Sequence, residues 1–127
     1  MKLRIKGASI RLRLTRGEVS DFAGSGLVKS ATPFGPRQPF TYTLMASDQA
    51  DTLTASFDGE GLSVVVPAAA ARRWAMTDEV GIEGEQPAGS EVLHILIEKD
   101  FQCLHRDDAR RDPDAYPHPM QDALPGR

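Results

Sequence analysis

Basic side chains recur at every second position near the start of the chain, which is the spacing of one strand face. Lys2, Arg4 and Lys6 alternate with apolar residues, and so do Arg11 and Arg13. Because successive side chains of a strand point to opposite faces, the members of each group share a face. Guanidinium and ammonium groups bind phosphate and carboxylate oxygens. Arg4, Lys6, Arg11 and Arg13 are therefore the candidate contacts to an anionic small molecule or protein partner.

Two glutamates in a later segment offer a different chemistry. Glu83 and Glu85 are two positions apart and point the same way if the segment is a strand, as a metal site or an acid/base pair requires. An exposed acidic edge is the alternative interpretation. Ion pairing across strands is the corresponding alternative for the basic residues, and its candidate partners are Glu79, Glu83, Glu85 and Glu98.

Histidine and cysteine give weaker signals. His94 has the chemistry of a general base, but no nucleophile stands beside it in a recognisable motif, so a structural role within a sheet is the alternative. Cys103, His105 and His118 are metal-ligand types whose spacing matches no zinc pattern. The sequence thus predicts no metal site, and it assigns no cofactor and no catalytic residue.

Familiar enzyme motifs are missing from the sequence. It holds no Walker-type lysine, no CxxC pair and no HExxH. Catalysis is thereby disfavoured, although residues from separate strands can form an active site without any local motif.

Composition bounds the class of protein. A chain of 127 residues, 40% hydrophobic and 26% charged, has material for one core. Its net charge of -3 disfavours nucleic acid as a partner. The single cysteine cannot form an internal disulfide, no signal peptide is apparent, and the longest uncharged run, residues 61–71, is too short to span a bilayer. We therefore expect a cytoplasmic protein with no membrane partner.

Hydrophobic periodicity predicts an α+β domain with a mostly antiparallel sheet and two short helices over residues 1–104. Thr15 and Glu18 form a capping-box pattern at the first helix start, and Gly7-Ala8 is expected to bend one long strand over residues 2–14. Helices are expected at 16–24 and 68–76, and further strands at 27–34, 40–47, 52–57, 62–66, 79–85 and 92–99.

The remaining residues, 105–127, form a segment rich in proline and aspartate. Such a composition predicts a disordered or loosely docked tail. Residues 112–117 would then be a solvated stretch, a peptide motif for a partner, or a cover for one end of the domain.

The chain resembles itself at an offset of 52 residues. Without gaps, Leu12 superposes on Val64, and Phe22 superposes on Trp74. The helix openers Thr15 and Pro67 also coincide. Two explanations of the match are open. One is a duplicated strand-helix-strand-strand unit, with residues 52–57 as an additional strand closing the first copy, and the other is a chance likeness.

A duplicated unit of this kind resembles the CYTH-like triphosphate tunnel proteins, in which an antiparallel barrel encloses a charged channel. The resemblance is architectural, and it implies a lumen that receives Arg11 and Arg13 together with Thr52, Thr54, Ser56, Glu83 and Glu85. That family's signature is a glutamate-x-glutamate-x-lysine run on the first strand. This chain has KLRIK at residues 2–6 instead, and arginines cannot hold magnesium, so hydrolysis by that mechanism is in doubt.

Three segments resemble a family of short bacterial proteins of unknown function. They are residues 4–14 (RIKGxSIRLRL), 80–84 (VGIEG) and 97–104 (IEKDFxCL), and the likeness extends to about residue 119. This resemblance implies no activity.

Three classes of function follow from the sequence. The leading hypothesis is a non-catalytic binding or interaction protein, with Arg11 and Arg13 as contacts to an anion. The runner-up is a metal-dependent, phosphohydrolase-like tunnel enzyme acting on a polyphosphate or nucleotide, which should gather Glu83, Glu85 or Glu98 in a concave lumen. A structural subunit, the third class, should expose an apolar sheet face.

Overall fold

The computed structural model describes residues 1–101, 114 and 116. This part of the chain contains eight strands and two helices. Cys103, His105, His118 and the predicted tail, apart from Asp114 and Tyr116, lie outside the described residues. The elements in chain order are β1 (Lys2–Lys6), β2 (Ser9–Leu14), α1 (Arg16–Ser25), β3 (Leu27–Thr32), β4 (Phe40–Ser47), β5 (Thr54–Phe57), β6 (Gly61–Pro67), α2 (Ala68–Met76), β7 (Gly81–Ala88) and β8 (Glu91–Lys99).

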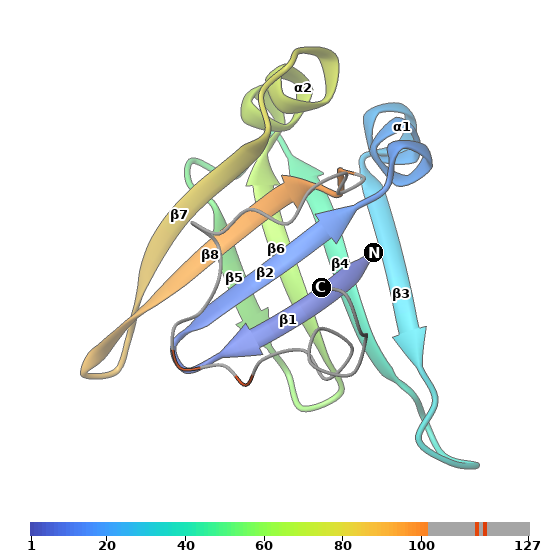
Figure 1. Cartoon of the computed structure of the whole chain (residues 1–127), viewed down its shortest axis with the longest axis vertical. Helices are drawn as coiled ribbons and strands as arrows, with labels where there is room; N and C mark the ends of the chain where they lie inside the picture. Colours follow the sequence, from blue (N-terminus) through green and yellow to red (C-terminus); the bar gives the residue numbers. More distant parts are fainter. Residues whose placement is uncertain (102–113, 115, 117–127) are drawn as a thin grey trace, which may run out of the picture.

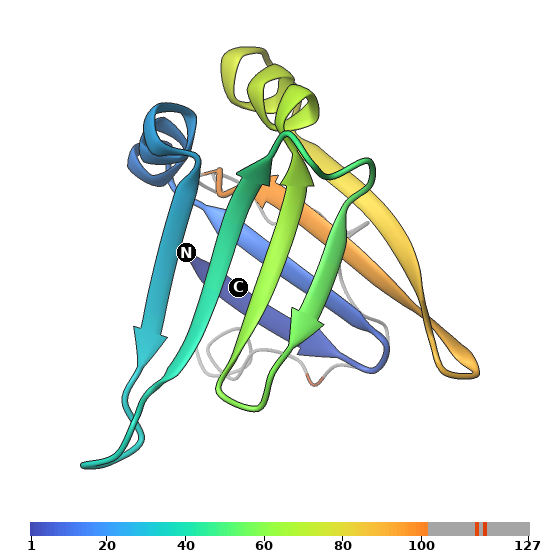
Figure 2. The ribbon, with the colours of Figure 1, turned by 180° about the vertical axis from the view of Figure 1, so that it is seen from behind.

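The strands form two four-stranded sheets packed face to face, with both helices at one end (Figure 1). Sheet A has the order β1-β2-β8-β7, and sheet B, which is in front in Figure 2, has the order β3-β4-β6-β5. Four of the six strand pairings are antiparallel, whereas β2–β8 and β4–β6 are parallel. The predicted α+β class with a mostly antiparallel arrangement is confirmed, and the two sheets do not close into a barrel.

The first ribbon differs from the prediction. Residues 2–14 form a hairpin of β1 and β2, with Lys2 opposite Arg13 and Lys6 opposite Ser9, and not one bent strand. Gly7 has a φ of 54°, as the first central residue of a two-residue hairpin turn requires. The apolar residues stand at odd-numbered positions before Gly7-Ala8 and at even-numbered positions after it. This change marks a reversal of the chain, which brings the apolar residues of β1 and of β2 to one face of sheet A.

The structure repeats one unit of five elements. The chain from β1 to β4 and the chain from β5 to β8 have the same order, strand-strand-helix-strand-strand. β1 pairs with β2 as β5 pairs with β6, since Lys2↔Arg13 shifted by 52 residues gives the observed Thr54↔Val65. The predicted duplicated unit is thus present in the topology, but β5 opens the second copy and corresponds to β1, where the sequence suggested a strand closing the first copy.

The two copies interlock through the parallel pairs. β2 of the first copy pairs with β8 of the second, and β6 of the second pairs with β4 of the first. Each sheet therefore contains the first hairpin of one copy and the last hairpin of the other. Neither copy holds a complete sheet.

The helices close one end of the sandwich. Thr15 caps α1 in a full capping box with Glu18, as predicted. Phe22 of α1 and Trp74 of α2, equivalent residues of the two copies, pack edge to face with ring centroids 6.1 Å apart. The indole nitrogen of Trp74 donates to the carbonyl of Val80 at 2.9 Å, which satisfies the polar atom of a fully buried ring.

The space between the sheets is an apolar core. Leu12, Leu14, Leu44, Val64, Val66 and Ile97 are fully buried, and no polar or charged residue is buried anywhere in the described part of the chain. The polar lumen implied by the CYTH-like resemblance is therefore wrong. Arg11, Arg13, Glu83 and Glu85 lie on the outside of sheet A, and Thr52, Thr54 and Ser56 are exposed.

One side chain joins the edges of the two sheets. Gln86 of β7 accepts a hydrogen bond from the amide of Ala55 in β5 and donates one to the carbonyl of the same residue, both at 2.8 Å. The side-chain amide thus gives the edge strand β5 the two bonds that a neighbouring strand would give it. This contact holds β7 of sheet A against β5 of sheet B.

Replacing Gln86 by leucine should destabilise the protein, because Gln86→Leu leaves the amide and carbonyl of Ala55 without their partners. We expect a loss of about 1–3 kcal/mol in the free energy of unfolding, measured by urea denaturation. Gln49→Ala, at an exposed position, should change it by less than about 0.5 kcal/mol. Equal stability of Gln86→Leu and the wild type would show that the bridge contributes nothing.

Candidate functional site

All the basic residues predicted to contact an anion lie on the outer face of sheet A. They alternate with core residues such as Leu12 and Leu14, whose burial fixes which side is inside. This outer face is formed, strand by strand, by Lys2, Arg4 and Lys6 of β1, Ser9, Arg11 and Arg13 of β2, His94, Leu96 and Glu98 of β8, and Gly81, Glu83 and Glu85 of β7. Both helices lie at one end of the sandwich, and neither packs over this face (Figure 1).

The strand register arranges these residues in three rows that cross the sheet from β1 to β7. The first row is Lys2, Arg13, Glu98 and Gly81; the second is Arg4, Arg11, Leu96 and Glu83; the third is Lys6, Ser9, His94 and Glu85. In each row the basic residues stand on β1 and β2, and the acidic residues stand on β7 and β8. The outer face of sheet A is therefore positive on one half and negative on the other.

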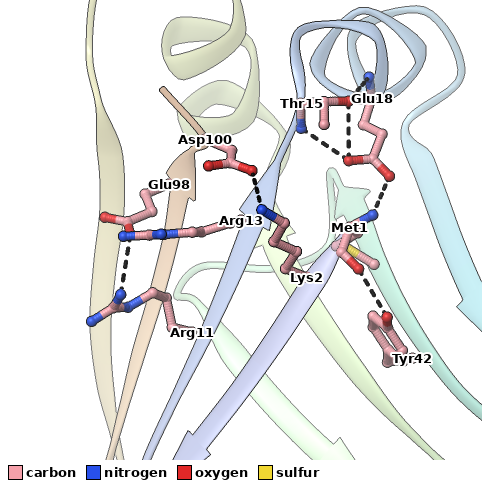
Figure 3. A network of polar contacts seen from close by, with 9 residues as sticks. All are labelled: Met1, Lys2, Arg11, Arg13, Thr15, Glu18, Tyr42, Glu98 and Asp100. Atoms are coloured by element: carbon pink, nitrogen blue, oxygen red, sulfur yellow. Dashed lines mark hydrogen bonds and ion pairs between the residues drawn. The ribbon is translucent and has the colours of Figure 1, made fainter. Parts of the chain in front are cut away.

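Glu98 of β8 lies at the border of the two halves and reaches toward Arg11 and Arg13 of β2 (Figure 3). Its Oε1 atom is 2.7 Å from Nε of Arg13 and 3.7 Å from a terminal nitrogen of Arg11. The carboxylate is largely shielded, with 18% of its side chain exposed, while the two arginines are about one third exposed. Cross-strand pairing, the alternative use of these arginines, is thus what the structure shows, with Glu98 as their partner and neither Glu83 nor Glu85.

Edge strand β1, which carries Lys2, Arg4 and Lys6, is anchored at its start (Figure 3). The Met1 ammonium pairs with Glu18 of α1, and the Met1 carbonyl accepts a hydrogen bond from the hydroxyl of Tyr42 in β4 at 2.8 Å. Lys2 pairs with Asp100 at 3.0 Å, and this bond holds the pKa of the Asp100 carboxyl below its usual range. The basic residues of β1 therefore stand on a fixed strand.

The acidic half holds Glu83, Glu85 and His94, all exposed. Glu83 and Glu85 point the same way, as expected, but only Glu85 has a partner that the structure shows, His94 Nδ1 at 3.0 Å. His94 is 59% exposed, so it is not a buried base; it lies within β8 with Glu85 as its partner, in keeping with the alternative of a structural role in a sheet. A shallow hollow of about 520 Å³ between the halves is lined by these three residues with Ser9, Arg11 and Leu96, among others.

Sequence reasoning missed Ser9. It stands opposite His94 across the parallel β2–β8 pair, and its hydroxyl donates to the carbonyl of Lys6 at 2.8 Å. No local signal could have joined two residues this far apart in the sequence, because only the pairing of β2 with β8 makes them neighbours.

The groups that this face presents are mainly charged side chains. Within the described residues, no group of three histidine, cysteine or carboxylate side chains is placed to hold a metal ion. Glu79, a further candidate partner for the strand arginines, pairs with Arg73 of α2 at 2.9 Å and takes no part in the face. None of the helices in this part of the chain has the length and apolar character needed to cross a membrane.

Comparison with protein families gives a match over most of the chain. The model of DUF7009, described as a family of unknown function, matches residues 1–120. The chain belongs to this family. The resemblance to a family of unknown function expected from the sequence is thereby confirmed, and the match extends beyond the predicted domain boundary at residue 104. Comparison with curated proteins found no match, and neither did comparison with solved structures.

The anchor of β1 should make stability depend on pH through Glu18. Although partial burial raises the pKa of this carboxyl, hydrogen bonds from the Met1 ammonium and from Thr15 outweigh it and bring the pKa below its ordinary value of 4.5. A carboxylate with a lowered pKa stabilises the fold above its unfolded value, and this contribution is lost as the pH falls through the folded value. Glu18→Gln keeps the capping box and removes the charge.

We expect Glu18→Gln to unfold at a lower temperature than the wild type at pH 7, with a difference that shrinks below about pH 4.5. Thermal unfolding followed by circular dichroism across pH 3–8 measures it. Glu60→Gln, at an exposed hairpin turn, is the control and should track the wild type throughout. A pH-independent difference would show that Glu18 acts through packing and not through its charge.

Proposed function

We propose that this protein is a non-enzymatic interaction module that recognises an anionic partner through the basic half of the outer face of sheet A. The contacts would come from Arg4, Lys6, Arg11 and Arg13. The partner presents carboxylate or phosphate groups, as an acidic protein surface or a small polyanion does. The location proposed is the cytoplasm, which the single cysteine of the sequence favours.

The observation that carries this proposal is that basic side chains from two strands converge on a face that neither α1 nor α2 covers. Arg4 is exposed on β1, directly opposite Arg11 on β2. Two guanidinium groups side by side repel each other unless an anion lies between or above them. Glu98 supplies such an anion to Arg11 and Arg13 from within the chain, but Arg4 has no ion pair with any residue in the described region.

The alternative, a metal-dependent tunnel enzyme, receives no support from the geometry. It needs glutamates gathered in a concave lumen, whereas the interior is apolar and Glu83, Glu85 and Glu98 face outward. Paired charges around a filled core are instead what an interaction module requires. The outer face of sheet A, built from charged residues, is not the broad apolar sheet face that the third class, a structural subunit, would expose.

Glu98 gives the proposal a sharp test, because it occupies the position that an external carboxylate or phosphate would take. Thermal unfolding would be measured with inorganic triphosphate and with hexaglutamate at low ionic strength, each with and without magnesium. A probe present at one hundred times its dissociation constant should stabilise the fold by roughly 2.7 kcal/mol, a shift of several degrees. Glu98→Gln should bind more tightly than the wild type, and Arg11→Ala on the order of tenfold more weakly.

Glu79→Gln is the matched control, since it removes the same charge and releases an arginine, Arg73, away from the face. It should bind as the wild type does. If neither probe shifts the unfolding temperature, or if the shift is the same in Arg11→Ala, the basic half is not a binding surface. A shift of the unfolding temperature that appears only with magnesium would instead support the hypothesis of a metal-dependent tunnel enzyme.

A further inference from the structure

The two halves of the outer face of sheet A are complementary to each other, and their order within each row is fixed by the register. Arg4 and Glu83 stand at opposite ends of the second row, on the edge strands β1 and β7. Both are exposed, and no ion pair joins either of them to another described residue. They are too far apart to meet within one chain, since two strands, β2 and β8, separate them.

A twofold axis parallel to the strands, between β2 and β8, would place a second copy of the whole chain over this face. Each row of the first chain would then lie over the same row of the second chain. The rotation carries β7 of the second copy over β1 and carries β8 over β2. Arg4 would then face Glu83 of the second copy, and Glu83 would face its Arg4. The first row follows the same rule, because Arg13 would face Glu98 of the second copy, so that positive meets negative at each of these positions.

We propose that the partner recognised by this face is a second copy of the same chain, in an isologous dimer of two A sheets packed face to face. The inference rests on the proposed function, which makes this face the binding surface. An acidic partner of another kind would satisfy the basic half and leave Glu83 and Glu85 uncovered, whereas a second copy satisfies both halves with one contact. Such self-complementarity is what a twofold interface requires.

The apolar part of this interface is small. Leu96 is the one large apolar side chain that the second row presents, and it would lie over the aliphatic stem of Arg11 of the second copy. Charge pairs near a solvent-accessible rim are weakened by salt. The dimer should therefore dissociate as the ionic strength rises, which distinguishes it from association through an apolar patch.

The test is sedimentation equilibrium of the full chain over a range of protein concentrations, at low and high salt, with a pair of charge reversals. Arg4→Glu and Glu83→Arg should each raise the dimer dissociation constant by at least about tenfold, because each places like charges opposite each other twice in the dimer. The double variant Arg4→Glu/Glu83→Arg restores opposite charges and should return the constant to within about threefold of the wild type. Lys29→Glu, on the outer face of sheet B, should leave it unchanged.

A wild type that stays monomeric at every concentration at low salt would overturn the inference. So would a dimer that withstands both single reversals, because it would use another surface, such as the edge of a strand. Circular dichroism checks that each variant folds, and the salt dependence of the wild-type dimer keeps the inference testable if one does not. A monomer that still binds triphosphate would leave the proposed function standing and refute only the second copy as partner.

Discussion

The parallel pairing of β2 with β8 is the contact on which the rest of the structure depends. It joins strands from opposite ends of the described chain, with Ser9 beside His94 and Leu14 beside Lys99. Because β4 and β6 are coupled in the same way, both the core and the outer face of sheet A are assembled from the two copies of the repeated unit. Contacts this distant in sequence form only after a long loop has closed, and such topologies fold more slowly than those with local contacts.

Features encoded within a few residues could be predicted from the sequence. The capping box of Thr15 and Glu18 and the proline before α2 place both helices. The prediction of one bent first strand was wrong, because a bulge and a tight turn at Gly7 both explain why the apolar residues change from odd to even positions there. The parallel pairs could not be foreseen, since strand register is decided by packing between segments and not by either segment alone.

The candidate site shows the same division. Alternation correctly placed Arg11 with Arg13 and Glu83 with Glu85 on common strand faces. Alternation does not say which strand face lies outside, because that depends on where the core lies. The tunnel interpretation wrongly placed the charged face inside. The choice of Glu98 as partner for the arginines, over the other glutamates, follows from the β2–β8 register, which sets it beside Arg13.

The interlocked copies also explain what the segment between β4 and β5 does. Each copy places its first hairpin in one sheet and its last hairpin in the other, which is the arrangement that two separate chains reach by domain swapping. Residues 48–53 tether the copies, so hairpin exchange takes place at the high effective concentration of a single molecule. A chain cut within residues 48–53 would give two pieces of the same topology, each holding half of each sheet. Neither piece could bury its apolar face until it bound the other piece.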